Sequence, residues 1–283
     1  MNRSSRTILA KQTVEIVECG SYNATVSGRV VDISASVRAC LDGTRFFSPE
    51  ELKRLRREVL GRPGHDFQTV FEVVNETTLA GIARVLARQR GPVAALNFAS
   101  AKNPGGGFLN GSEAQEESLA RSSGLYASLL RAREFYDRHR GLPSLLYSDA
   151  MILSPDCPVI RDDDGSLLEE PHLASFITSA APNAGALENN QPEKLSLVPE
   201  ALRQRAEYVL ALAASQGYKQ LVLGAWGCGV FRNDPGVVAE AFLGHLQKGT
   251  WSGRFECVVF SVLDRSPSQE TWSAFQRAAG LNS

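Results

Sequence analysis

From residue 67 to the C-terminus, short apolar segments alternate with longer segments that carry one apolar face, and this alternation constrains the fold more than any other feature. The apolar segments are typical of buried strands and cover 69–75, 93–100, 172–180, 219–225 and 255–264, with two further short strands around Pro155 within 150–160. Helices are expected at 76–89, 116–139, 199–217, 235–247 and 267–279. The alternation predicts a three-layer α/β/α fold with a mixed, mostly parallel sheet, whose ligands bind at the carboxyl ends of the strands.

The first 66 residues do not follow this alternation, and we expect a small, mainly helical N-terminal extension there. Two helices and one short extended ribbon are predicted in it, over 5–18, 48–60 and 24–34. The second helix has Ser48 as a good N-cap and Pro49 in its first turn. The segment GRPGHD at 61–66 breaks the pattern, so we expect an extension of residues 1–66 and a main domain of residues 67–283.

The composition argues against several classes of protein. Among 283 residues, 30 Lys and Arg nearly balance 31 Asp and Glu, so charge gives no reason to expect a nucleic-acid or membrane partner. No apolar run approaches the roughly 18 residues of a membrane span, and the N-terminus lacks the uninterrupted apolar stretch of a signal peptide. Five cysteines without a CxxC pair argue against a zinc site and a disulfide framework. We therefore expect a cytoplasmic protein with reduced thiols and with neither a metal nor another cofactor.

Two glycine-rich loops each follow a predicted strand and precede a predicted helix. The first spans 101–114 and contains Gly105, Gly106 and Gly107, and the second is GAWGCGVFRND at 224–234. Glycines let successive backbone N–H groups line up around an anion, and a helix N-terminus adds partial positive charge. Each loop alone is compatible with a simple turn, but two at one edge of a sheet favour a diphosphate ligand. Neither loop matches the lysine-containing nucleotide loop or the GxGxxG dinucleotide fingerprint.

Two adjacent carboxylates, Glu116 and Glu117, follow the first loop. One interpretation is structural, because Ser112 and Gln115 have the spacing of a capping box and acids are favoured in the first turn of a helix. The other interpretation is catalytic. Neighbouring helical side chains point about 100° apart, so the two carboxylates cannot flank one bond and must differ in role.

The spacing resembles that of a known family. GGG, seven residues and then QEE is similar to the signature of poly(ADP-ribose) glycohydrolases. The segments NFASAKNPGGG, SAAPNAG and GAWGCGVFRNDP resemble the shorter, bacterial-type branch, and the similarity runs from about residue 70 to the C-terminus. The N-terminal region resembles the small helical extension of that branch less distinctively. The resemblance implies a macrodomain that hydrolyses ribose–ribose O-glycosidic bonds from chain ends, acts on poly(ADP-ribose) or ADP-ribosylated proteins and releases ADP-ribose.

The resemblance also implies a role for individual residues. Glu117 is the acid/base that protonates the departing 2′-oxygen and then takes a proton from water. Glu116 binds the hydroxyls of the departing ribose, Asn103 holds those of the ribose being cleaved, and Phe231 forms an aromatic wall against the distal ribose. The full set of substrate-binding residues implied is Asn103, Gly105, Gly106, Gly107, Gln115, Gly224, Ala225, Trp226, Gly227, Cys228, Gly229, Val230 and Phe231.

Two alternatives stay open at the level of sequence. A non-catalytic macrodomain that only binds ADP-ribose needs the glycine loops but not Glu117, and a hydrolase of protein-linked mono-ADP-ribose uses a similar pocket. Five further residues have either a ligand-binding or a capping and turn interpretation: Asn75, Glu76, Thr77, Asn183 and Asp264. Cys228 is expected to fill the loop rather than act as a nucleophile, because no histidine partner lies near it in sequence.

Overall fold

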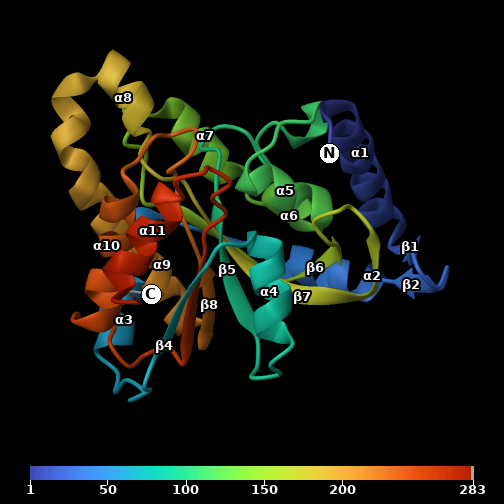
Figure 1. Cartoon of the computed structure of the whole chain (residues 1–283), viewed down its shortest axis with the longest axis horizontal. Coiled ribbons are helices and arrows are strands. Elements are labelled where there is room, and N and C mark those ends of the chain that lie inside the picture. The colour runs from blue at the N-terminus through green and yellow to red at the C-terminus, as the bar shows by residue number, and fades with distance from the viewer. Residues whose placement is uncertain (282–283) are drawn as a thin grey trace.

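A seven-stranded sheet runs through the middle of the molecule (Figure 1), in a computed structural model that describes residues 1–281. The strands follow the order β3 (Arg45–Phe47), β6 (Met151–Arg161), β7 (Leu167–Ser179), β5 (Val93–Phe98), β8 (Gln220–Leu223), β9 (Cys257–Ser261) and β4 (Val70–Val74). The five strands from β7 to β4 run parallel, and β6 is antiparallel to both of its neighbours. The predicted α/β class with a mixed, mostly parallel sheet is therefore confirmed.

Helices cover both faces of this sheet. In Figure 1, α3 (Pro49–Leu60), α9 (Val198–Ser215), α10 (Pro235–Gln247) and α11 (Glu270–Ala279) lie on one side, and α4 (Thr78–Leu86), α5 (Gln115–Ser122) and α6 (Leu125–Leu129) lie on the other. Two separate clusters of buried apolar side chains fill the two interfaces. All positions of β8 and β9 are buried, as expected for parallel strands that are covered on both faces.

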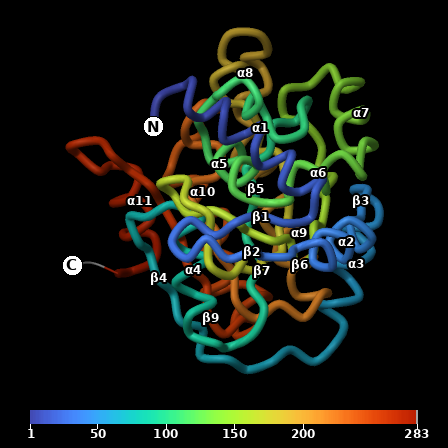
Figure 2. The backbone as a smooth tube through the Cα atoms, turned by 90° about the vertical axis from the view of Figure 1, so that its right-hand side faces the viewer, coloured from blue at the N-terminus to red at the C-terminus, as the bar shows by residue number. Residues whose placement is uncertain are grey.

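The remaining elements lie at the ends and edges of the sheet. They are α1 (Arg3–Cys19), a hairpin of β1 (Ser21–Asn23) and β2 (Val30–Asp32), α2 (Ser34–Gly43), the 3₁₀ turn η1 (Phe108–Asn110), α7 (Arg133–Gly141), α8 (Ala184–Asn190) and the 3₁₀ segment η2 (Pro192–Leu197). Figures 1 and 2 both show α1 beside α5. The strand β3 lies before residue 67 and pairs with β6 of the main sheet, and the division of the chain at 66/67 stays a prediction.

Two local predictions are wrong. The single helix expected at 116–139 is three helices. The first break comes at Ser123, which adopts extended geometry and forms an isolated bridge with Val159 of β6, and the second at Ala132, which has non-helical backbone angles. The two short strands expected within 150–160 are one strand with a change of register between Ser154 and Cys157. There the chain bulges at Pro155 and then continues along β7, so the proline does not end the strand.

The predicted N-cap at Ser48 is confirmed. Ser48 Oγ accepts the N–H of Glu51, whose carboxylate accepts the N–H of Ser48 in return, which completes a capping box at the start of α3. Asp234 caps α10 through the N–H of Val237 at 2.9 Å. Within residues 1–281, the helices lack the combination of length and apolar character that crossing a membrane requires.

Candidate active site

The three consecutive glycines allow the chain to pack tightly against the start of α5. Gly106 has φ of +59°, and a Cβ there would collide with the carboxylate of Glu117, with Cδ only 2.9 Å away. A Cβ on Gly107 would collide with the side chain of Ser112, and one on Gly105, where φ is +67°, would press on two aromatic rings. The glycines are therefore required by the close approach of this loop to a carboxylate, and by two left-handed backbone positions.

The adjacent glutamates have different surroundings. Glu117 is half-buried, and its Oε1 accepts the backbone N–H of Gly107 at 3.0 Å. Glu116 is 2% exposed, and it accepts the N–H of Ser100 at 2.7 Å and the amide of Asn97 at 3.2 Å. Burial raises the pKa of Glu116 to about 8, although these two hydrogen bonds oppose the shift. At neutral pH Glu116 is therefore mostly protonated.

Gln115 connects the first turn of α5 to the end of β5. Its Oε1 accepts the N–H of Phe98 at 2.9 Å, and its Nε2 donates to the carbonyl of Leu96 at 2.7 Å and to Thr78 at 3.1 Å. The capping box expected between Ser112 and Gln115 is wrong, because residue 114 is the N-cap and no side chain caps the helix. The Gln115 amide bonds instead to β5 and so ties the first turn of α5 to the end of that strand.

The second glycine loop leaves the same edge of the sheet. β8 pairs in parallel with β5, so the loops after these two strands start side by side. Gly227 has φ of +73°, and a Cβ there would collide with the amide of Asn233 and lie 2.7 Å from Cβ of Ala181. Within residues 1–281, several backbone N–H groups of this loop have no hydrogen-bond partner, among them those of Gly227, Gly229, Val230 and Phe231. Such a row of free N–H groups beside the start of α10 can bind an anion.

The side chains of this loop differ in their access to a ligand. The Trp226 side chain is fully buried and donates to the carbonyl of Ser179 at 3.0 Å, so only its backbone is available. Burial raises the pKa of Cys228 to about 12, which keeps its thiol protonated and fits its expected role as loop filling. Phe231 is half-buried and lies 6.1 Å from the Tyr147 ring.

Asn103 lies in the first loop with its side chain exposed. Its N–H donates to Oγ of Ser100 at 3.2 Å, and its carbonyl accepts the N–H of Gly106 at 3.0 Å. The backbone of Asn103 is therefore held beside the three glycines, while its amide is free to meet a ligand.

For five residues the sequence allowed either a ligand-binding or a capping and turn interpretation, and all five make contacts within the protein. Thr77 caps α4 and Asn183 caps α8, each through its side-chain oxygen. Glu76 forms an ion pair with an arginine of α4. Asn75 and Asp264 exchange two hydrogen bonds of 2.9 Å, which join the ends of β4 and β9. These contacts support the capping and turn interpretations.

One group of site residues was missed in the sequence. Asn97 is fully buried on β5, opposite Thr178 of β7, and its amide contacts both Thr178 and Glu116. The signal was present, because an asparagine inside the apolar segment VAALNFAS must find a buried partner. Ser100, whose N–H binds Glu116, could not be recognised from its type, since its backbone makes the contact.

The site contains no obvious metal centre. In the part of the chain that the structure describes, residues 1–281, no group of three His, Cys, Asp or Glu side chains is arranged to hold a metal ion. What the arrangement offers is two adjacent carboxyl groups, Glu117 half-buried and Glu116 buried and neutral, and a row of free N–H groups at the same edge of the sheet.

The chain resembles known proteins in both sequence and structure. A family model for the catalytic domain of microbial-type poly(ADP-ribose) glycohydrolase matches residues 10–162. The chain is similar to a poly(ADP-ribose) glycohydrolase structure from Thermomonospora curvata bound to the inhibitor ADP-HPD, with 49% identity, coverage of 97% of this chain and 99% of that chain, and a TM-score of 0.90. The enzyme from Deinococcus radiodurans in complex with ADP-ribose is 50% identical over 86% of this chain and 96% of that chain, with a TM-score of 0.81. No curated protein sequence matches the chain.

Proposed function

Because the chain belongs to the microbial-type poly(ADP-ribose) glycohydrolase family, we propose that it hydrolyses the ribose–ribose O-glycosidic bonds of poly(ADP-ribose) and releases ADP-ribose. The observation that carries this proposal is the pairing of two loops at one sheet edge. One presents free N–H groups suited to a diphosphate, and the other holds the carboxylate of Glu117. A protein that only binds ADP-ribose would need the glycine loops but not the carboxylate of Glu117.

In the proposed reaction Glu117 moves the proton. Cleavage at an anomeric carbon passes through an oxocarbenium-like state and needs an acid for the leaving oxygen and a base for water. Glu117 donates a proton to the departing 2′-oxygen and then removes one from the attacking water. The carbon–oxygen bond to the departing ribose breaks, a new bond to the water oxygen forms, and Glu117 is again protonated at the end.

We assign Glu116 to binding and not to proton transfer. It is deeply buried and its pKa is raised to about 8, so at neutral pH its carboxyl group can donate as well as accept a hydrogen bond. This suits contact with the hydroxyls of the departing ribose. Asn103 would hold the ribose that is cleaved, and the backbone from Gly224 to Phe231 would hold the diphosphate.

We infer that the enzyme acts from chain ends. Phe231 lies beside the ring of Tyr147, and an aromatic wall at this point would block further polymer beyond the distal ribose. Chain-end cleavage predicts that ADP-ribose is the earliest product. Long free oligomers early in a digestion would contradict this part of the proposal.

We also infer that the protein works on poly(ADP-ribose) or ADP-ribosylated proteins in the cytoplasm. All five cysteines, which lie within the described residues, are free thiols. Free thiols are typical of a reducing compartment. Fractionation of cells that express the protein, followed by detection of the chain in the soluble fraction, tests the location.

The decisive experiment compares the wild type with Glu117→Gln on a poly(ADP-ribosyl)ated acceptor. The replacement keeps size and hydrogen bonding but removes the transferable proton, so ADP-ribose release should be lost while ADP-ribose binding persists. Glu134→Gln, at an exposed position on α7, is the matched control and should behave as wild type. No release by the wild type despite tight binding of ADP-ribose would identify a non-catalytic binding protein.

A second substrate tests the remaining alternative, a hydrolase of protein-linked mono-ADP-ribose. A protein carrying single ADP-ribose units lacks the ribose–ribose bond, so the proposed enzyme should leave it intact. Faster release from this substrate than from the polymer would instead indicate a hydrolase of protein-linked mono-ADP-ribose.

A further inference from the structure

The N-terminal helix α1 binds the outer end of the first glycine loop. Nε of Arg6 donates to the carbonyl of Gly111 at 2.8 Å, and Nη1 of Arg6 forms an ion pair with Glu113 at 2.6 Å. Arg3 donates to the carbonyl of Asn110 at 2.9 Å. The side chain of Arg6 is only 14% exposed, whereas that of Glu113 is 49% exposed, so the arginine is enclosed between the helix and the loop while its carboxylate partner faces solvent.

The loop has a glycine where α1 touches it. Gly111 has φ of +73°, and a Cβ there would lie 2.5 Å from the carbonyl oxygen of Arg3 and 2.8 Å from Oγ1 of Thr7. Any other residue would push the helix and the loop apart. A glycine 105 positions after Arg6 in sequence is therefore required by the close approach of this helix.

This contact is connected to the catalytic carboxylate by three hydrogen bonds. The N–H groups of Asn110 and Ser112 both donate to the carbonyl of Gly107, at 3.0 and 3.2 Å. Gly107 in turn donates its own N–H to Glu117 at 3.0 Å. A shift of the segment that Arg6 holds would therefore move the donor that orients Glu117.

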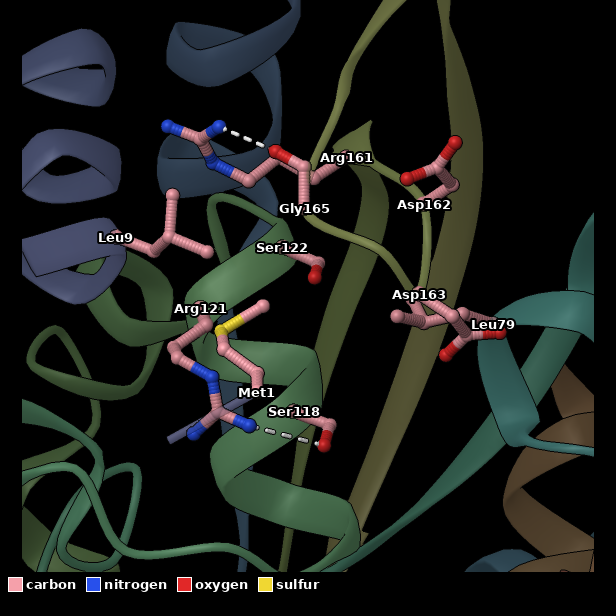
Figure 3. A pocket seen from close by; sticks show the side chains of 10 residues that line it. All are labelled: Met1, Leu9, Leu79, Ser118, Arg121, Ser122, Arg161, Asp162, Asp163 and Gly165. Atoms are coloured by element: carbon pink, nitrogen blue, oxygen red, sulfur yellow. Dashed lines mark hydrogen bonds between the residues drawn. The ribbon is translucent and has the colours of Figure 1, made fainter. Parts of the chain in front are cut away.

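A second connection runs through α5 itself. Arg121, one turn after Glu117, donates to the carbonyl of Ser112 at 2.8 Å, and Thr13 of α1 donates to the carbonyl of Arg121. Figure 3 shows Arg121 beside Met1, with its bond to Ser118. The cavity left between α1, α5 and the β6–β7 turn has a volume of only about 40 Å³, too small for a substrate. The helix is thus packed closely against the element that carries the carboxylates.

We propose that Arg6 is a positioning residue for Glu117, and that the N-terminal helix serves to fix the first glycine loop in its reactive geometry. The inference rests on the proposed function for its effect on turnover. It concerns the reacting carboxylate and not the diphosphate, because the second glycine loop is packed on Ala181 and Asn233. Loss of the arginine should therefore lower kcat far more than it weakens ADP-ribose binding.

The experiment uses the full chain with Arg6→Ala, Arg6→Lys and Lys11→Ala. Lys11 is exposed on the same helix, so its replacement removes the same charge without touching the loop. Arg6→Ala should lower kcat on poly(ADP-ribose) by about 10- to 100-fold, the range expected for a misplaced reacting group. The Kd for ADP-ribose should change by less than about threefold, which is well under one tenfold step in affinity. Lysine keeps the charge near Glu113 but loses the Nε donor, so Arg6→Lys should recover only part of kcat.

Hydrogen exchange of the backbone provides a measurement that does not depend on activity. Exchange should accelerate at 105–113 in Arg6→Ala, while 224–234 and the Lys11→Ala protein stay as in the wild type. Unchanged kcat and exchange in Arg6→Ala would overturn the inference, and so would an equal loss of ADP-ribose affinity and turnover. If Arg6→Ala does not fold, Arg3→Ala takes its place. It removes only the exposed hydrogen bond to the carbonyl of Asn110, and it must lower kcat and accelerate exchange at 105–113 in the same way but by less. A wild type that releases no ADP-ribose refutes the proposed function alone, and the exchange at 105–113 still decides the role of Arg6.

Discussion

Oε1 of Glu117 accepts the backbone N–H of Gly107 at 3.0 Å, so the carboxyl group that we propose as the acid/base is oriented by the glycine loop in front of it. The neighbouring Glu116 is held by Asn97 of β5 and by the backbone of Ser100, two residues beyond the end of that strand. Two carboxylates adjacent in sequence are thus fixed by different parts of the fold. This explains how one of them can be buried and neutral while the other stays half-buried beside the loop.

Replacement of Gly106 by alanine should abolish turnover. The added Cβ would collide with the Glu117 carboxylate, and alanine is strained at φ of +59°. We expect kcat to fall by about 100-fold or more, measured as ADP-ribose release. Gly141→Ala, where a Cβ meets no atom within 4 Å, is the control and should retain wild-type kcat. A Gly106→Ala protein with normal kcat would mean that the loop does not orient the carboxylate.

Replacement of Gly227 should damage the second loop. A Cβ there would strike Asn233 and Ala181, and φ of +73° disfavours alanine. We expect a loss of about 1–3 kcal/mol in stability from strain of this kind, together with weaker binding of ADP-ribose by calorimetry. Gly229→Ala in the same loop meets no atom within 4 Å, so its Tm should stay near that of the wild type. Equal Tm values for the two variants would contradict this account.

The sequence predicted those parts of the site that depend on local signals. The glycine loops, the cap at Ser48 and the alternation of strands and helices all follow from residues close together in the chain. The wrong predictions concern residues whose structure depends on contacts with residues far away in sequence. Ser123 breaks the helix expected at 116–139 because it pairs with Val159 of β6, and the cap expected at Ser112 fails because the Gln115 amide bonds to β5.

The contact between α1 and the first glycine loop could not be predicted from the sequence either. Nothing in the local sequence of Arg6 or Gly111 indicates that they meet, since both have ordinary alternatives as a surface cation and a turn glycine. Only the packing of the N-terminal helix against α5 brings them together.

The ion pair of Asp149 with Arg205 should matter for stability, because it is largely buried. The Arg205 side chain is 2% exposed, and its Nε lies 2.9 Å from Asp149. Asp149→Ala leaves the arginine with only carbonyl partners, so we expect a loss of about 3–5 kcal/mol in the free energy of unfolding by denaturant titration. Glu200→Ala removes the partner of Arg203 on the same helix, where both side chains are exposed, and should cost less than about 1 kcal/mol. Similar losses for the two variants would contradict the prediction.

The neutral state of Glu116 should give the protein a characteristic dependence of stability on pH. In the folded chain burial raises its pKa to about 8, whereas the ordinary pKa of an exposed glutamate is 4.5. Between these values the folded state holds a proton that the unfolded chain has lost, so stability falls as pH rises from 4.5 to 8. Below pH 4.5 Glu116 is protonated in both states, so it no longer makes the stability depend on pH.

Glu116→Gln should therefore stabilise the protein at neutral pH, since glutamine resembles the protonated acid and cannot ionise. The variant also has a partner available, because Oδ1 of Asn97 has none within residues 1–281 and can accept the new amide once the Asn97 amide turns. The gain in the free energy of unfolding should grow with pH to the order of a few kcal/mol near pH 8 and vanish near pH 4.5. Denaturant titrations of both proteins across this range measure the difference, with Glu134→Gln as an exposed control that should show no such trend. A Glu116→Gln protein that is less stable than the wild type at pH 7.5, or a difference independent of pH, would mean that Glu116 is already ionised in the folded state.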